Sequence, residues 1–309
     1  MNTKYHNISN TNNFHFNSEL QYLKRDDAKI AFDFYPAQNN CERLLILVNG
    51  YQRTRLDFRA FRKRLHSYLP TIATIALDNR YCGQSEVFSA DKNLDFQSSP
   101  EALLFEMARD VVELGHIFCN LLSLSRFSLL GISMGGMIAQ CVAAQEPQAI
   151  EHLALVSTTA GGAARVFPSH ISDPKSIKYQ ELTGNNEISE MMERYFAKRF
   201  LEHSPLLFDM FVKTMQKQSH AQPKSSENAK KQFYASLAFD GTVQISKIKA
   251  KTCIFSGDED RVIPLENSLF LKKAIPFAEF KLYKETGHLL LIEEPEHFTQ
   301  DVAEFLKSN

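Results

Sequence analysis

The stretch of sequence that decides the fold is Phe127-Ser128-Leu129-Leu130-Gly131-Ile132-Ser133-Met134-Gly135-Gly136-Met137-Ile138-Ala139-Gln140. It passes from an apolar, strand-like segment through a Gly-x-Ser-x-Gly pentapeptide into residues that favour helix. A pentapeptide of this kind between a strand and a helix is typical of a nucleophile elbow, a sharp turn that exposes a serine hydroxyl. The stretch therefore predicts a strand, a tight turn and a helix, with Ser133 as the nucleophile.

The small residues of this stretch have a physical reason. A turn this sharp strains the backbone of the serine, and only glycine at positions 131 and 135 lets the neighbouring backbone segments approach closely. Gly136 and Ala139 would then let the helix lie close against the sheet. A bare Gly-x-Ser-x-Gly is more often a glycine-rich strand end with a surface serine, so the strand before it and the helix after it are what favour catalysis.

Length and composition describe an ordinary globular protein. The 309 residues suffice for one large α/β domain with an insertion, and 44% are hydrophobic while 23% are charged. The net charge of -1 and the pI near 6.8 provide no general field for collecting nucleic acid or an anionic membrane surface. Any partner must therefore be recognised locally, and we expect no nucleic-acid partner.

The cysteines and the amino terminus bear on location. The five cysteines are widely spaced and include no C-x-x-C pair, so they predict neither a disulfide framework nor a zinc site: Cys41, Cys82, Cys119, Cys141 and Cys253. Residues 1–17 form a polar, asparagine-rich tail without the apolar centre of a signal peptide. No apolar run approaches the roughly 20 residues that span a bilayer. A cytoplasmic protein without an integral membrane segment is the expectation.

Strand-like and helix-like segments alternate along the chain. The segments 19–25 and 29–35 suggest an antiparallel hairpin at a sheet edge, because apolar and polar residues alternate in them. Buried strands are predicted at Arg43–Val48, Ile72–Leu77, Phe127–Ile132, 152–156, 252–256 and Glu279–Tyr283, and helices at 56–68, from Pro100 onward and at 295–306. This order predicts an α/β fold with a mainly parallel central sheet and helices on both faces.

The alternation stops between residues 161 and 241. Three short helices are predicted there, at 188–201, 206–215 and 227–237, with a polar break at 216–226. We interpret 161–241 as a helical cap over the carboxyl edge of the sheet, and 18–160 with 242–309 as the α/β core. Most apolar residues of this insertion are expected to form its own core, while some should face a pocket; Phe208 and Phe211 are candidates for the latter.

A serine hydroxyl needs a base within hydrogen-bond reach and a third group that orients the base. Among the 10 histidines, His288 stands in a loop just after a late strand and beside Gly287. From there a side chain can reach back over the carboxyl edge of the sheet. His288 is therefore the predicted base, whereas His116, His203 and His297 fall within predicted helices.

The orienting acid should also follow a strand, between the serine and the histidine in chain order. The loop after residue 156 contains no carboxylate, but the loop after residue 256 contains Asp258, Glu259 and Asp260. We choose Asp260 and keep Asp258 as the reserve. The remaining carboxylates would belong to a solvated acidic turn.

A family resemblance covers the chain from about residue 43 to the end. The order Asn49-Gly50, Asp78-x-Arg80-x-x-Gly83-x-Ser85, Gly131-x-Ser133-x-Gly135-Gly136, Gly257-x-x-Asp260-x-x-x-Pro264 and Gly287-His288 resembles the α/β-hydrolase fold superfamily. Within it, the chain looks like the esterase, enol-lactonase and haloperoxidase-like group with a helical cap. The resemblance implies a triad of Ser133, Asp260 and His288. It also implies an oxyanion hole formed by the backbone N–H groups of Met134 and Tyr51.

The chain departs from the family pattern at two places. Asn49-Gly50 stands where the family usually has His-Gly, and Asn49 can still hydrogen-bond and hold the loop. Tyr81 replaces a glycine near the expected pocket, where it either narrows the pocket or simply packs. Asn49, Gly50 and Tyr81 join Phe208 and Phe211 as the predicted substrate-binding residues.

Together these features predict a serine hydrolase without metal or cofactor. Its substrate would be a small to medium, partly apolar carboxylic ester, cleaved through an acyl-enzyme. Acyl transfer, lactone opening and carbon–carbon bond hydrolysis by the same triad are alternatives, because a fold does not decide among them. A non-catalytic ligand-binding protein of the same fold is a further alternative. The sequence leaves acyl-chain length and oligomeric state open.

Overall fold

The computed structural model describes residues 20–88, 98–179, 185–221 and 226–308, so the expected tail at 1–17 lies outside the described residues. In this part of the chain the strands form one sheet in the order β1-β2-β4-β3-β6-β7-β8-β9, with β5 beside β2. Their bounds are β1 Leu20–Lys24, β2 Ala28–Tyr35, β3 Arg43–Val48, β4 Ile72–Leu77, β5 Glu86–Val87, β6 Phe127–Ile132, β7 Ile150–Val156, β8 Lys251–Gly257 and β9 Glu279–Tyr283.

The predicted strand arrangement is confirmed. β1 and β2 pair antiparallel at one edge of the sheet, whereas β4, β3, β6, β7, β8 and β9 pair parallel. The last residue of β3, Val48, is level with Leu77 of β4 and Gly131 of β6. The loops after these parallel strands therefore emerge at one edge, which is where open α/β sheets place their sites.

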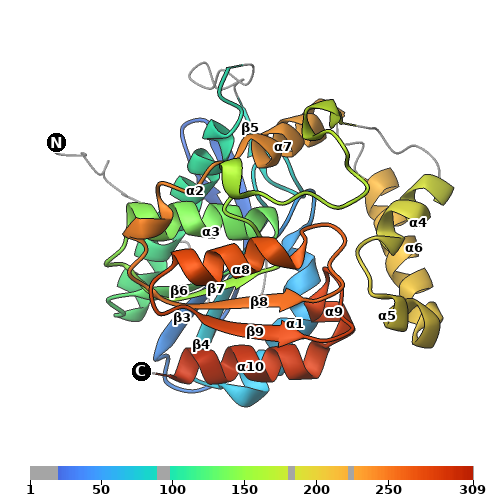
Figure 1. Cartoon of the computed structure of the whole chain (residues 1–309). Helices are drawn as coiled ribbons and strands as arrows, with labels where there is room; N and C mark the ends of the chain where they lie inside the picture. Colours follow the sequence, from blue (N-terminus) through green and yellow to red (C-terminus); the bar gives the residue numbers. More distant parts are fainter. Residues whose placement is uncertain (1–19, 89–97, 180–184, 222–225, 309) are drawn as a thin grey trace.

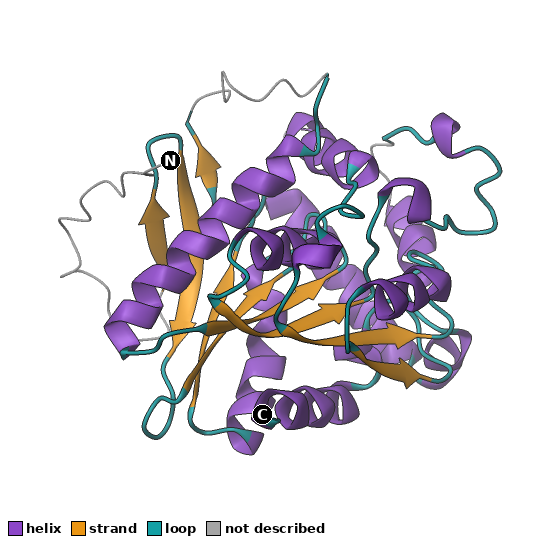
Figure 2. Ribbon diagram, turned by 60° about the vertical axis from the view of Figure 1, so that its left-hand side comes forward, coloured by secondary structure: helices purple, strands orange, loops and turns teal. Residues whose placement is uncertain are grey.

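Helices cover both faces of the sheet (Figures 1 and 2). Alternate residues of β3 belong to two separate cores: Leu44 and Ile46 pack with α2, α3 and α8, and Leu45 and Leu47 pack with α1 and α10. This is the packing of a strand buried on both sides. The helices of these layers are α1 Arg59–Tyr68, α2 Ala102–Leu122, α3 Met134–Gln145, α8 Leu265–Ala274, α9 Leu290–Glu293 and α10 Pro295–Lys307. No helix among the described residues is both long and apolar enough to cross a membrane.

The turn between β6 and α3 has the predicted form. Ser133 adopts φ 55° and ψ -119°, a strained conformation for a residue with a side chain, and α3 begins at the next residue. A Cβ atom at Gly131 would lie 2.3 Å from the carbonyl oxygen of Gly135, and one at Gly135 would lie 2.1 Å from the carbonyl oxygen of Val48. Only glycine fits at these two positions, because the opposing atoms belong to the backbone.

The insertion between β7 and β8 contains α4 Asn185–Glu193, α5 Lys198–His203, α6 Pro205–Ala221 and α7 Ser226–Ala238. The predicted single helix at 188–201 is wrong, because α4 ends at Glu193 and α5 begins only at Lys198. Phe196 and Ala197, between the two helices, are buried. The predicted break at 216–226 is also too long, since α6 continues to Ala221. In Figure 1, α4, α5 and α6 lie beyond the carboxyl ends of β8 and β9.

Gly135→Ala tests the close approach of α3 to the strand ends. We expect the free energy of unfolding to fall by about 3 kcal/mol, because the added methyl group would overlap the backbone of β3 and cannot be relieved by a rotamer change. Urea unfolding measures the change. Gln145→Ala, at an exposed position of the same helix, should stay within about 0.5 kcal/mol of the wild type. Equal stability of the two variants would contradict the packing described.

Candidate active site

Ser133 is held by its backbone at the end of β6. Its N–H donates to the carbonyl oxygen of Val156 at 2.9 Å, and its own carbonyl oxygen accepts from Gly136 N at 2.9 Å and Thr158 Oγ1 at 2.7 Å. The neighbouring loop is close, because a Cβ atom at Gly50 would lie 3.8 Å from Ser133 Oγ. These bonds fix a strained turn whose half-buried side chain stands beside the loop after β3.

Asp260 and His288, which follow β8 and β9, are joined by a hydrogen bond. His288 Nδ1 lies 2.7 Å from Asp260 Oδ2, and both side chains are buried. Asp260 Oδ1 accepts from the N–H groups of Val262 and Ile263, each at 2.8 Å. Both oxygens of the carboxylate are thus engaged, which fixes the orientation of the imidazole ring. Nε2 of His288 has no hydrogen-bond partner among the described residues.

The other two carboxylates of this loop lie elsewhere. Asp258 accepts from Glu285 N at 2.7 Å and pairs with Lys284 at 3.2 Å, and Glu259 accepts from Lys198 N at 3.1 Å. Asp258, the reserve acid, therefore belongs to a partly solvated turn. Of the three candidate acids, the structure brings only Asp260 into contact with His288.

Ser133 and His288 stand on the same edge of the sheet, since β6, β8 and β9 are parallel. Within the described residues, no hydrogen bond joins Ser133 Oγ to His288. Catalytic hydrogen bonds are often long in ligand-free structures and tighten when substrate binds. The structure thus gives one of the two hydrogen bonds that a triad requires.

Two backbone N–H groups near Ser133 have no acceptor among the described residues, one in the loop after β3 and one at the start of α3. In the described part of the chain, the N–H groups of Tyr51 and Met134 donate to no protein group. Asn49 holds this loop in place: its Oδ1 accepts from Gly50 N at 2.8 Å, and its Nδ2 donates to Thr54 O at 2.9 Å and Asp57 Oδ2 at 2.8 Å. The side chain of Asn49 is therefore engaged within the loop.

Tyr81 occupies a left-handed conformation, with φ 64°, and its side chain is buried in the core. The Nζ atom of Lys231, on α7, lies 4.5 Å from the centre of its ring. Gln232 of α7 also bonds to the loops after β3 and β4. Its Oε1 accepts from Gln52 N at 3.0 Å, and its Nε2 donates to Arg80 O at 2.6 Å. Tyr81 thus packs between the core and the insertion.

Phe208 and Phe211, on α6, pack against Phe196 with ring centres 5.6 and 5.2 Å apart. They border a small cluster within the insertion, and the guanidinium of Arg53 lies 5.0 Å from the centre of the Phe211 ring. Both rings therefore pack against this cluster, and their role in binding substrate stays a prediction.

The Asp78–Ser85 motif builds a scaffold of buried charges. Arg55 contacts Asp33 at 2.9 Å and Asp78 at 2.5 Å, and Arg80 contacts Asp110 at 2.7 Å. Burial raises the pKa of Asp110 to about 6 although Arg80 opposes the shift. Pairing lets these charges remain inside the protein, where they hold the loops after β3 and β4 in place.

Sequence reasoning missed three residues, which contact His288 itself, adjoin Asp260 in the chain, or bond to Gly287. The ring of Tyr195 stands edge-on to the imidazole, with centres 5.3 Å apart. Arg261 donates to the carbonyl oxygens of Glu193 and Phe196. Glu293 accepts from the N–H groups of Gly287 and Ala197, and burial raises its pKa to about 7. The signal for Glu293 was an acid directly after the apolar run 289–292.

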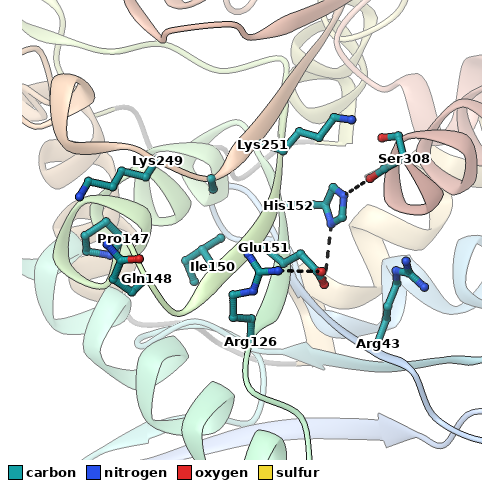
Figure 3. A pocket seen from close by; sticks show the side chains of 11 residues that line it. Arg43, Arg126, Pro147, Gln148, Ile150, Glu151, His152, Lys249, Lys251 and Ser308 are labelled. Carbon is teal, nitrogen blue, oxygen red and sulfur yellow. Dashed lines mark hydrogen bonds and ion pairs between the residues drawn. The ribbon is translucent and has the colours of Figure 1, made fainter.

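A cavity of about 620 Å³ lies at the opposite edge of the sheet, among the residues that begin β3, β7 and β8 (Figure 3). Its cations are largely balanced: Arg126 pairs with Glu151 at 3.3 Å and Lys251 with Glu279 at 3.7 Å. The His152 ring there contacts the carbonyl oxygen of Ser308 at 2.9 Å. This cavity lies far along the strands from the elbow. No group of three His, Cys, Asp or Glu side chains among the described residues could hold a metal ion.

Comparison with known proteins agrees with this arrangement of strands and loops. The sequence model described as "alpha/beta hydrolase fold" matches residues 44–295. The chain belongs to the α/β hydrolase family. Its predicted fold class is thereby confirmed from the sequence as well as from the structure.

Individual relatives are distant. Lipase 3 of Moraxella sp. (strain TA144) is 24% identical over 266 residues, covering 84% of this chain and 76% of the lipase. The 2-hydroxy-6-oxononadienedioate/2-hydroxy-6-oxononatrienedioate hydrolase of Escherichia coli (strain K12) is 27% identical over 188 residues, covering 60% of this chain and 64% of that enzyme. The enol-lactonase from Burkholderia xenovorans LB400 superposes with a TM-score of 0.70 at 21% identity, covering 93% of this chain and 100% of that structure.

Glu293 gives the stability of this α/β hydrolase a pH dependence. Its folded pKa of about 7 exceeds the ordinary value of 4.5, so the folded state binds the proton more tightly than the unfolded state. This contribution is present below the ordinary pKa and is lost as the pH rises through 7. Between about pH 5 and about pH 8, the wild type should lose about 2 kcal/mol of unfolding free energy relative to Glu293→Gln.

Urea unfolding of both proteins across this pH range measures the difference. Glutamine does not titrate, so the comparison cancels the contribution of every other group. A difference between the two proteins that stays constant with pH would contradict the assignment.

Proposed function

We propose that this α/β hydrolase is a serine hydrolase that cleaves a carboxylic ester of a small to medium, partly apolar molecule. Ser133 is the nucleophile, His288 the general base and acid, and Asp260 the group that orients His288. The observation that carries the proposal is the 2.7 Å bond between Asp260 and His288 at the sheet edge that also bears the strained Ser133 turn. A base oriented by a carboxylate, at the same sheet edge as a half-buried serine, is the arrangement that acyl transfer requires.

The reaction follows from the hydrogen-bonding capacity of these groups. Asp260 holds the proton on Nδ1 of His288, which leaves Nε2 with a lone pair that takes the Ser133 hydroxyl proton as Oγ attacks the ester carbonyl. The imidazolium then gives this proton to the departing alkoxide, and an acyl-enzyme remains. Water attacks the acyl group by the same route, His288 again taking and returning the proton, and the carboxylic acid leaves.

The negative charge on the carbonyl oxygen needs donors during both steps. The unengaged N–H groups of Met134 and Tyr51 support their assignment as the oxyanion hole, since a backbone donor without a protein partner is available to substrate. Each donor would contribute about 3 to 4 kcal/mol to transition-state stabilisation. Asn49 serves this role indirectly, because it holds the loop that carries the Tyr51 N–H group.

Aromatic side chains beside the loop after β3 support a partly apolar substrate. The ring of Tyr51 contacts Phe233 of α7 at 6.3 Å between centres, and Phe233 contacts Tyr179 at 5.9 Å. The named relatives include a lipase, a dienedioate hydrolase and an enol-lactonase. Lactone opening and carbon–carbon bond hydrolysis therefore stay as alternatives for the same triad, and a panel of p-nitrophenyl esters, lactones and vinylogous diketones separates them.

Removing the nucleophile tests the serine mechanism. Ser133→Ala should lower kcat/KM for short p-nitrophenyl esters by about 10⁴-fold or more, because the variant lacks the oxygen that would form the acyl-enzyme. Initial rates of nitrophenolate release measure this. Ser67→Ala, at an exposed helical site, should keep the wild-type rate. Turnover by Ser133→Ala at the rate of the wild type would rule out this mechanism.

A second pair of variants tests which acid orients His288. Asp260→Asn should lower kcat by about 10³-fold or more, because an amide facing Nδ1 favours the wrong tautomer. Asp258→Asn, two residues earlier, should change kcat by less than about threefold, because its carboxylate faces Glu285 and Lys284. The same ester assay serves for both, and a larger loss in Asp258→Asn would reverse the assignment.

A further inference from the structure

The loop that carries His288 is in contact with the break between α4 and α5. We call residues 195–197 the anchor segment. The N–H of His288 donates to the carbonyl oxygen of Tyr195 at 2.8 Å, and the Tyr195 ring stands edge-on to the imidazole. The backbone and the ring of His288 are therefore both in contact with the insertion.

The contact is tight at Gly287. A Cβ atom there would lie 2.7 Å from Ala197 N, 2.8 Å from Phe196 C and 2.8 Å from Tyr195 O. All three atoms are backbone atoms of the anchor segment, so the backbone at Gly287 is in direct contact with the backbone of the anchor segment. Any displacement of the anchor segment would therefore be transmitted to the residue next to His288.

A single carboxylate joins the two segments. Glu293, the last residue of α9, accepts from Gly287 N through both oxygens at 3.1 Å, and its Oε2 also accepts from Ala197 N at 2.9 Å. Arg261, beside Asp260, donates to Phe196 O at 2.8 Å. The loops that carry Asp260 and His288 thus both contact the anchor segment. Glu293 is the side chain that bonds at once to the anchor segment and to residues 284–292, which we call the histidine loop.

Burial of the ionised Glu293 side chain costs folding free energy. Burial raises its pKa to about 7, which shows that the surroundings disfavour its charge. Ionised, it accepts hydrogen bonds from two segments at once; protonated, one oxygen becomes a donor facing backbone donors. We therefore attribute the presence of a carboxylate here to the hydrogen bonds that join the loop of His288 to the anchor segment.

We propose that Glu293 is a positioning residue for the reaction. By bonding to Gly287 and Ala197 together, it fixes the position of the His288 imidazole relative to the anchor segment. The proposal rests on the proposed function for its effect on turnover. Its structural part, the coupling of residues 284–292 to the anchor segment, does not.

Two variants of Glu293 and one control test the proposal. Glu293→Gln retains one acceptor oxygen and Glu293→Met retains none, so their effects should be graded. Glu294→Gln makes the same charge change one residue later, at a side chain with no hydrogen bond among the described residues. The readouts are ester kcat and KM, and backbone hydrogen exchange of peptides covering 193–203 and 284–292, measured on the full chain.

At about pH 8, above the pKa of about 7 of Glu293, we expect Glu293→Gln to lower kcat on the order of tenfold with KM changed by less than about threefold, and Glu293→Met to lower it further, as for the loss of charge-assisted hydrogen bonds. Both peptides should exchange faster in each variant and remain unchanged in Glu294→Gln. If Glu293→Met does not fold, Glu293→Gln alone decides.

Exchange that rises in only one peptide, or in neither, would overturn the coupling. Faster exchange in both peptides with wild-type kcat would overturn the positioning role. A wild type that cleaves no ester would count against the proposed function, whereas the exchange measurement would still decide whether Glu293 joins the two segments.

Discussion

The structure depends on the contact between the first turn of α3 and the ends of β3 and β6. Gly135 lies so close to the carbonyl oxygen of Val48 that a methyl group would fall 2.1 Å from it. This contact forces Ser133 into its strained conformation and presents the side chain at the carboxyl edge. Burial of the surrounding strands on both faces supplies the stability that offsets the strain.

The other parts of the candidate site are fixed by polar contacts between loops. Asn49 holds the loop after β3, Asp260 fixes the His288 ring, and Glu293 joins the histidine loop to the insertion. These three side chains come from separate regions of the sequence, and each engages backbone groups of its neighbours. Parallel strands bring their loops to one edge, while such side chains determine how the loops are oriented there.

The sequence predicted the sheet, its helices and the candidate triad because those features leave local patterns. Apolar runs mark strands that are buried on both sides, and the glycines around Ser133 mark a close approach. The break between α4 and α5 was missed because residues 188–201 have continuous helical spacing; the contact of residues 195–197 with Gly287, nearly a hundred residues later, interrupts the helix. Glu293 was missed for another reason: its place after an apolar run marks the residue, but its partners are backbone N–H groups, which the sequence does not identify.

The central claim is that Ser133 is a nucleophile activated by His288. Treating the protein with a fluorophosphonate and mapping the adduct by peptide mass spectrometry tests it directly. The account predicts one adduct per chain, on the peptide that contains Ser133. No adduct, or an adduct on another residue, would contradict it.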